Sequence, residues 1–188
     1  MAQNDSVMGL SDDDELVLKI INEVVEKLAK AWMEKPWYWP QEIDIQAELR
    51  GRLDAALTLE GLNLATWMNN EVRWVEPRVV CEPAWEDGIL KPDVVVWGDK
   101  LDPEKPDNSV PALWACEIKY DTQESKEQKD IEKLQKMFVK GYMRFGCALV
   151  FKDGNNPDRK LGKPEPISQY PKLEKLVVIA RRNRSTVG

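Results

Sequence analysis

The stretch from residue 91 to residue 119 constrains the fold most strongly, because it holds two apolar runs whose polar residues lie at their outer ends. The runs at 94–97 and 112–116 are rich in β-branched and aromatic residues. Between them lie Gly98, three prolines and several Asp and Asn residues. This pattern predicts two strands joined by a long loop.

The polar residues at the ends of these runs are expected to meet in space. If the two strands pair antiparallel, the start of the first lies beside the end of the second, which places Asp93 near Glu117. Side chains alternate along a strand, so Glu117 and Lys119 point to one face and Ile118 to the other. Two carboxylates and an ammonium group at one edge of an apolar pair are typical of a metal site that binds phosphate.

The composition limits the architecture. A chain of 188 residues with 43% hydrophobic content suffices for one domain with a sizeable core. We expect that domain at residues 11–180, between a flexible acidic tail at 1–10 and a basic tail at 181–188. No apolar run approaches the roughly 20 residues of a membrane span, and no signal-peptide pattern begins the chain, so we expect a cytoplasmic protein without a membrane partner.

The chain contains no histidine, which excludes histidine bases, Ser-His-Asp and Cys-His catalysis, and imidazole metal sites. Its cysteines, Cys81, Cys116 and Cys147, lie in apolar stretches without a CxxC spacing and are interpreted as buried, reduced thiols. The net charge is −6, but residues 1–15 hold five acids and no basic residue, so nucleic-acid binding is not excluded. Metal or acid–base chemistry must then use carboxylates, lysines, tyrosines or water.

Hydrophobic periodicity predicts an α/β fold with a mixed central sheet flanked by helices. The elements expected are a helix capped by Ser11 and running to about residue 33, a helix at 44–59, a strand at 71–81 broken near Pro77, the two central strands, a helix at 123–143, a strand at 147–151, a loop at 152–171 and a strand at 176–180. Three aromatic residues lie between Pro36 and Pro40. They either offer a stacking platform for bases or anchor a linker to the core, the second arrangement being the more frequent.

The residues Pro92-Asp93 and Glu117-Ile118-Lys119, each at the end of an apolar strand, resemble the motif of the PD-(D/E)xK nuclease superfamily. The resemblance covers about residues 44–151, since a Glu-bearing helix precedes the strands and another helix follows the motif. It implies a restriction-endonuclease-like αβββαβ core, to which this chain adds an N-terminal helix.

The resemblance also implies roles for the motif residues. Asp93 and Glu117 would coordinate Mg²⁺ or Mn²⁺, with the backbone carbonyl of Ile118 as a further ligand. Lys119 would orient the attacking water or stabilise charge that develops on the phosphate.

Glu48 matches the helix carboxylate that many members of the superfamily place beside the metal, as a further metal-ligating and catalytic residue. It lies about 100° from Leu49, on the border of the apolar stripe of its helix, so it can turn inward. It can equally pair with Arg52 on the surface, at the i,i+4 spacing. Glu42 is its rival for the role in the site.

The helix after the motif carries lysines at steps of three and four, which places them on one face: Lys126, Lys129, Lys133, Lys136 and Lys140. This face would bind nucleic acid by contacting phosphates. The alternative is a solvated helix whose interspersed acids neutralise most of the charge.

The sequence therefore predicts a Mg²⁺- or Mn²⁺-dependent nuclease that hydrolyses phosphodiester bonds, with DNA as the expected substrate. The chain is also compatible with a non-catalytic protein- or nucleic-acid-binding module built on a nuclease-like fold, with an acidic regulatory protein, or with a plain salt-bridged strand end. The sequence leaves undecided whether the protein forms a homodimer and whether it is an endonuclease or an exonuclease.

Overall fold

The computed structural model of the 188-residue chain describes residues 10–36, 38–39, 41–69, 72–83, 88, 90–98, 112–121, 124–153, 160–167 and 169–180. The helices in these ranges are α1 (Asp12–Glu34), α2 (Glu42–Leu59) and α3 (Glu124–Val139). The strands are β1 (Leu64–Asn69), β2 (Val72–Pro77), β3 (Val79–Cys81), β4 (Val94–Trp97), β5 (Ala112–Tyr120), β6 (Met143–Asp153), β7 (Lys160–Leu161), β8 (Glu165–Ile167) and β9 (Tyr170–Ala180). Apart from Leu10, both expected tails lie outside the described residues.

A mixed seven-stranded sheet forms the centre, in the order β3-β4-β5-β6-β9-β7, with β8 also paired to β9. Strands β3, β4 and β5 are antiparallel neighbours, whereas β5, β6 and β9 run parallel. Helix α3 makes the crossover between the parallel strands β5 and β6. The α/β class with a mixed sheet, expected from the sequence, is confirmed.

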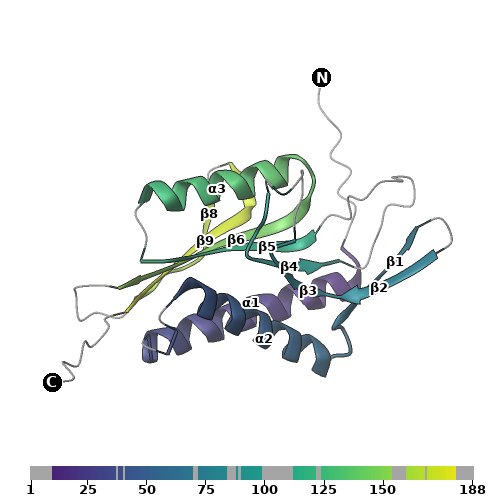
Figure 1. The fold of residues 1–188 in the computed structure, drawn as a ribbon, viewed down its shortest axis with the longest axis horizontal. Helices are drawn as coiled ribbons and strands as arrows, with labels where there is room; N and C mark the ends of the chain where they lie inside the picture. Colours follow the sequence, from purple (N-terminus) through teal and green to yellow (C-terminus); the bar gives the residue numbers. More distant parts are fainter. Residues whose placement is uncertain are drawn as a thin grey trace.

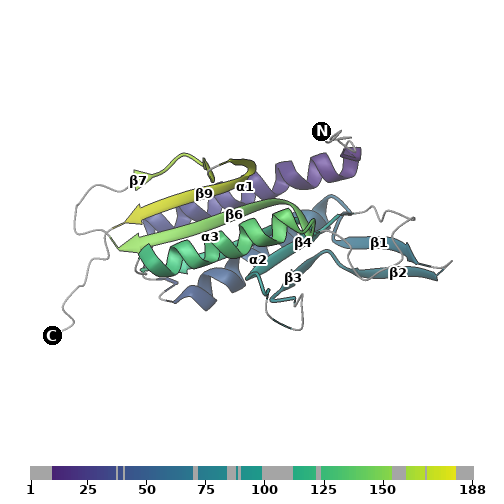
Figure 2. The ribbon, with the colours of Figure 1, turned by 90° about the horizontal axis from the view of Figure 1, so that it is seen from above.

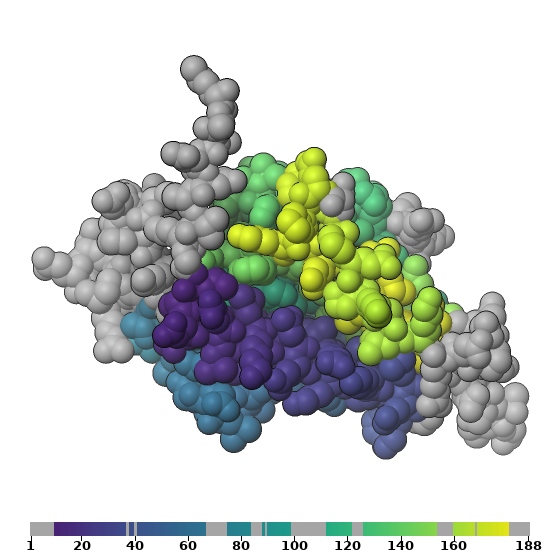
Figure 3. All heavy atoms as spheres, turned by 180° about the vertical axis from the view of Figure 1, so that it is seen from behind, coloured from purple at the N-terminus to yellow at the C-terminus, as the bar shows by residue number. Residues whose placement is uncertain are grey.

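Helices cover both faces of the sheet (Figure 1), with α1 and α2 on one face and α3 on the other. Trp32, Leu49 and Ile118 belong to the core on the α1/α2 face, while Leu134 and Met137 belong to the core on the α3 face. Seen from behind (Figure 3), α1 lies beside the strands near the C-terminus, and it contacts β7 and β9. No helix in the described ranges is long and apolar enough to cross a bilayer.

Local signals in the sequence account for the ends of the helices. Ser11 caps α1 as expected, because its Oγ accepts the N–H of Asp14 at 3.1 Å. Helix α3 ends at Val139 rather than at residue 143, because Gly141 adopts a φ of +72° that stops the helix. The apolar spacing that suggested a longer helix includes Tyr142, which lies past this turn.

Several strands differ from the sequence-based expectation. Strands β6 and β9 begin earlier, at Met143 and Tyr170, because pairing with neighbouring strands continues past the apolar runs. The region 152–171, expected to be a loop, contains β7 and β8. The break expected near Pro77 is confirmed, since β2 ends at Pro77 and β3 begins at Val79.

Strands β1 and β2 form a separate antiparallel hairpin (Figure 2), of which the sequence predicted only the second strand. The base of this hairpin is held by Arg78, whose side chain is buried. Its guanidinium donates hydrogen bonds to the carbonyl oxygens of Leu62, Leu64 and Trp97, at 2.6, 3.1 and 3.0 Å. A buried arginine therefore joins the hairpin to the central sheet.

The expected buried thiols are present at two of the three cysteine positions. Cys116 and Cys147 are buried on adjacent strands, and Cys81 is half-buried. Burial raises the pKa of the Cys147 thiol to about 12 and that of Cys116 well above its ordinary value. These thiols stay protonated and unreactive at neutral pH.

Candidate active site

The candidate site lies beside the start of β4, next to the last residues of β5, which extend beyond the part of β5 that pairs with β4. Strand β4 pairs with β5 only as far as Cys116, so the last residues of β5 have β6 on one side and no described strand on the other. Asp93 lies at this point, directly before β4. Its N–H donates to the carbonyl of Cys116 at 3.0 Å, and its Oδ2 accepts the N–H of Ile118 at 2.5 Å.

Glu117 is the buried carboxylate of the site, with 1% of its side chain exposed. Nζ of Lys133 lies 2.6 Å from its Oε1, yet neither oxygen receives a well-directed hydrogen bond from the described residues. Burial first, and the charge of Asp93 second, raise the pKa of Glu117 to about 8 although Lys133 opposes the shift. The ammonium of Lys133 therefore does not outweigh burial and the charge of Asp93, so the Glu117 carboxyl binds a proton readily at neutral pH.

Burial also raises the pKa of Asp93, although the N–H of Ile118 and the charge of Lys119 oppose the shift. The structure thus brings Asp93 and Glu117 together, as antiparallel pairing of their strands predicts. Two neighbouring carboxylates with raised pKa values bind protons readily, and a cation at the same place would compete with those protons.

Lys119 links three elements through its ammonium group. Its Nζ donates to Oε1 of Glu42 on α2 and to the carbonyl of Ile118, both at 2.9 Å, and lies 3.6 Å from Oδ2 of Asp130 on α3. Burial alone would lower the pKa of Lys119, but the hydrogen bond to Glu42 and the charges of Asp93 and Asp130 outweigh it and raise the pKa. Lys119 therefore stays charged beside the two carboxylates.

Helix α2 contributes Glu42 rather than Glu48 to this site. Gln46, one turn after Glu42, donates from Nε2 to the carbonyl of Asp93 at 2.7 Å, so this face of the helix contacts the site. Glu48 lies two residues further, about 200° around the helix. Its Oε1 accepts a hydrogen bond from Nε of Arg52 at 2.7 Å, which is the surface pair that the sequence left open.

The lysine face of α3 divides into two parts. Lys133 lies at the site, where its Nζ contacts Glu117 and donates to the carbonyl of Lys91 at 2.9 Å. The other candidate lysines of this helix, Lys126, Lys129 and Lys136, have exposed side chains. Lys133 is therefore part of the carboxylate cluster, and the remaining lysines form the charged outer surface.

Two further residues of the site were not singled out from the sequence. Asp130 lies 3.6 Å from Lys119 and 3.7 Å from Lys133, so it bridges the two ammonium groups. Gln46 is buried on α2, on the same face as Glu42 at the i,i+4 spacing. Neither Asp130 nor Gln46 could be assigned without knowing how the helices pack on the sheet.

The donor atoms of the site fit a hard divalent cation. Among the described residues no three histidine, cysteine or acidic side chains form a group that could hold a metal. A cation would therefore depend on Asp93, Glu117 and the carbonyl of Ile118, which also accepts a hydrogen bond from Lys119. Mg²⁺ is commonly held by one or two carboxylates and keeps several waters. The carboxylate of Glu117 is buried with Lys133 as its charged neighbour and without a well-directed hydrogen bond from the described residues, so its oxygens are the feature that a cation would satisfy.

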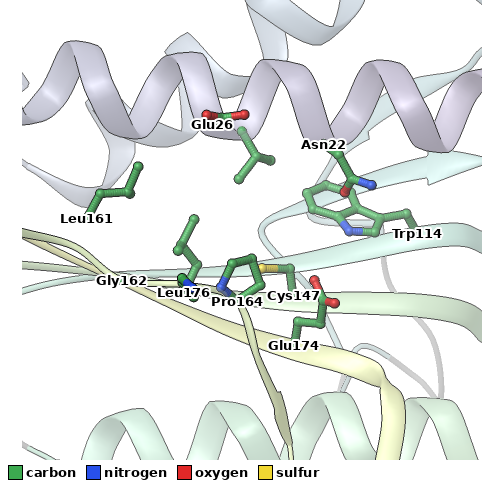
Figure 4. A pocket seen from close by; sticks show the side chains of 11 residues that line it. Asn22, Glu26, Trp114, Cys147, Leu161, Gly162, Pro164, Glu174 and Leu176 are labelled. Atoms are coloured by element: carbon green, nitrogen blue, oxygen red, sulfur yellow. The ribbon is translucent and has the colours of Figure 1, made fainter.

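A separate hollow of about 540 Å³ lies on the α1 side of the sheet (Figure 4). Trp114, Cys147 and Leu176 contribute apolar side chains to it, and Glu26 and Glu174 contribute carboxylates. None of the clustered acids and lysines lines this hollow. It is therefore distinct from the candidate site.

A comparison of the chain with protein-family models, with curated proteins and with solved structures found no match. The function must therefore be inferred from the geometry of the residues themselves.

Proposed function

We propose that this protein is a metal-dependent nuclease that hydrolyses phosphodiester bonds, with DNA as its substrate. The observation that carries the proposal is Glu117, a buried carboxylate without a well-directed hydrogen bond from the described residues, beside Asp93 and Lys119. With the separate β1–β2 hairpin set aside, the elements follow the order α2-β3-β4-β5-α3-β6 with β5 and β6 parallel, which supports the proposal because the resemblance implies an αβββαβ core.

Asp93, Glu117 and the Ile118 carbonyl would hold Mg²⁺ or Mn²⁺. When bound, the cation would polarise the phosphate and lower the pKa of a coordinated water. Of the two helix carboxylates that the sequence left open, Glu42 rather than Glu48 would act in the site, since Glu42 contacts Lys119 and Glu48 pairs with Arg52.

Lys119 would position the attacking water or stabilise negative charge on the phosphate, because its ammonium is held between Glu42 and the Ile118 carbonyl. Lys133 neutralises part of the charge of Glu117 in the absence of metal. The ammonium of Lys133, which also donates to the carbonyl of Lys91, would contact a phosphate oxygen of the bound strand. The exposed lysines of α3, Lys126, Lys129 and Lys136, would contact phosphates further along the strand.

A non-catalytic binding module is the second candidate function. It is favoured by one observation, that the two lysines of the site already pair with acids: Lys119 with Glu42, and Lys133 with Glu117. Such a network can stabilise a fold without metal, although buried ion pairs contribute little net stability. In either case the free cysteines suit a reducing compartment such as the cytoplasm.

The test is a cleavage assay on plasmid, linear duplex, single-stranded and branched DNA, with RNA in parallel. Purified protein is incubated with Mg²⁺, with Mn²⁺, or with EDTA. We expect cleavage of DNA with either metal and none with EDTA. Nucleic-acid binding without cleavage under every metal condition would favour the module, and cleavage in EDTA would overturn the metal mechanism.

A further inference from the structure

We propose that Tyr38, between α1 and α2, is a stacking platform for an unpaired base of the nucleic acid held at the candidate site. The platform rests on the proposed function and specifies its substrate, a strand that presents an unstacked base. Single strands, frayed ends and branch points have such bases, whereas blunt duplexes do not.

Tyr38 is exposed although its neighbours are anchored. Pro36 is buried and Trp39 packs against the core on the α1/α2 face, so these two residues hold the segment in place. Tyr38 keeps 62% of its surface accessible. Anchoring of the segment to the core therefore accounts for the burial of Pro36 and the partial burial of Trp39. It does not account for the aromatic ring of Tyr38, which is exposed.

The backbone of Tyr38 is held in position, because its N–H donates to the carbonyl of Lys35 at 3.1 Å. The ring is restrained on one side by Trp39, whose ring centroid lies 6.5 Å away. Trp39 is held in turn by the guanidinium of Arg52, 5.7 Å from its centroid, and Arg52 by Glu48. A restrained ring loses little conformational entropy when a base stacks on it.

A positive charge lies beside this ring. Nζ of Lys35 is 5.4 Å from the centroid of Tyr38, and the Lys35 side chain is exposed. An aromatic face next to an ammonium group is the combination that binds single-stranded nucleic acid, because the ring stacks on the base and the cation attracts the phosphate. The charge of Arg52 is already neutralised by Glu48, so Lys35 supplies the attraction.

The platform and the candidate site lie close together. Glu42 follows Tyr38 by four positions in the chain, so their Cα atoms are at most about 14 Å apart. The carboxylate of Glu42 contacts Nζ of Lys119 at 2.9 Å. In Figure 1 this connection lies at the end of the domain where β6 ends, and β5 runs parallel to β6. At 3.4 Å per nucleotide, about four nucleotides of helical strand span the roughly 14 Å or less between the Cα atoms of Tyr38 and Glu42.

The experiment measures fluorescence anisotropy of a labelled single strand of about 12 nucleotides, and of a blunt duplex, in EDTA so that no cleavage occurs. The variants are Tyr38→Ala and Tyr38→Trp, with Ile43→Ala as a matched control because Ile43 is also exposed, at 57%, in the first turn of α2. We expect Tyr38→Ala to weaken single-strand binding by about 5- to 150-fold and to leave duplex binding unchanged. Tyr38→Trp and Ile43→Ala should bind like the wild type.

A charge variant adds a second measurement. Lys35→Gln should reduce the log–log salt slope of single-strand binding by about 0.7. Equal single-strand affinity of Tyr38→Ala and the wild type would overturn the platform, and so would an equal loss for single strand and duplex. If the wild type cleaves DNA but Tyr38→Ala binds normally, only the platform fails. If Tyr38 governs binding but no metal supports cleavage, only the nuclease proposal fails.

Discussion

The carboxylate of Asp93 accepts the backbone N–H of Ile118 at 2.5 Å, and thereby takes the place of the neighbouring strand that β5 lacks beyond β4. The same contact holds the Asp93 carboxylate beside Glu117, whose pKa the charge of Asp93 helps to raise. One hydrogen bond thus extends the sheet and assembles the acidic pair. Asp93 therefore has a structural role, as hydrogen-bond acceptor, and a proposed catalytic role, as charged ligand. Two different substitutions can separate these roles.

Asp93→Asn keeps an oxygen that accepts the Ile118 N–H but removes the negative charge, whereas Asp93→Ala removes both. We expect both variants to lose metal-dependent cleavage and Mn²⁺ binding. Asp93→Ala should also lose about 1–3 kcal/mol of unfolding free energy, because a backbone donor is left without a partner, and Asp93→Asn should lose less. Urea unfolding and Mn²⁺ titration measure the two effects, and full cleavage by Asp93→Asn would contradict the assignment of Asp93.

The raised pKa of Glu117 predicts that the unfolding free energy depends on pH in the absence of metal. Its pKa rises from the ordinary 4.5 to about 8 on folding, so the folded state binds more protons than the unfolded state between these values. The unfolding free energy should therefore be highest below about pH 4.5 as far as Glu117 contributes, and should fall as pH rises toward about 8. Glu117→Gln should remove this part of the decrease, as measured by urea unfolding in EDTA across this range.

Metal binding should offset the loss of unfolding free energy that the ionisation of Glu117 causes. A bound cation favours the ionised carboxylate, so binding should release protons at neutral pH and stabilise the wild type. Calorimetric titration of Mn²⁺ in buffers of different ionisation enthalpy measures the released protons. Equal proton release by Glu117→Gln and the wild type would mean that the cation binds elsewhere.

Glu42 and Glu48 form a matched pair for testing the contribution of α2. Glu42→Gln should slow cleavage, because the ammonium of Lys119 loses the charge that holds it. Glu48→Gln should leave the cleavage step itself unchanged and cost at most about 0.5 kcal/mol of unfolding free energy, because Glu48 pairs with Arg52 beside Trp39 rather than with Lys119. Single-turnover rates compare the two, and the reverse ranking would restore Glu48 as the helix carboxylate of the site.

The exposed lysines of α3 should control the salt dependence of binding. Replacing Lys126, Lys129 and Lys136 together by Gln should flatten the log–log salt slope on duplex DNA by up to about 2.7, because each phosphate contact contributes about 0.9. Glutamine keeps the helix propensity close to that of lysine, so folding should not change. An unaltered slope would show that these lysines are a solvated surface.

Lys133 should behave differently from those three lysines. Lys133→Gln removes the ammonium that lies 2.6 Å from Glu117, so Mg²⁺ or Mn²⁺ should bind more tightly for lack of a competing charge. Cleavage should still fall, because the group proposed to reach the phosphate is gone. Weaker metal binding in Lys133→Gln than in the wild type would contradict this competition.

The sequence by itself determined which residues converge at the motif. Alternation along β5 separates Glu117 and Lys119 from Ile118, and antiparallel pairing brings Asp93 to the same edge. The alternation follows from the period of a strand, which is a local property. The meeting of Asp93 and Glu117 also requires antiparallel pairing, which the sequence leaves as a condition and the structure shows. Ser11 as the cap of α1 is local in the same sense.

Tertiary structure alone decided which helical residues join the motif. Glu42 and Glu48 are both compatible with the periodicity of α2, and the rotation of that helix against the sheet brings Glu42 to Lys119 and turns Glu48 toward Arg52. The packing of α3 likewise selected Lys133 from five lysines of similar spacing. The attachment of the β1–β2 hairpin could not be predicted for a related reason. Arg78 holds the base of the hairpin, and its charged side chain is buried because it donates to three carbonyl oxygens that only the folded chain brings together.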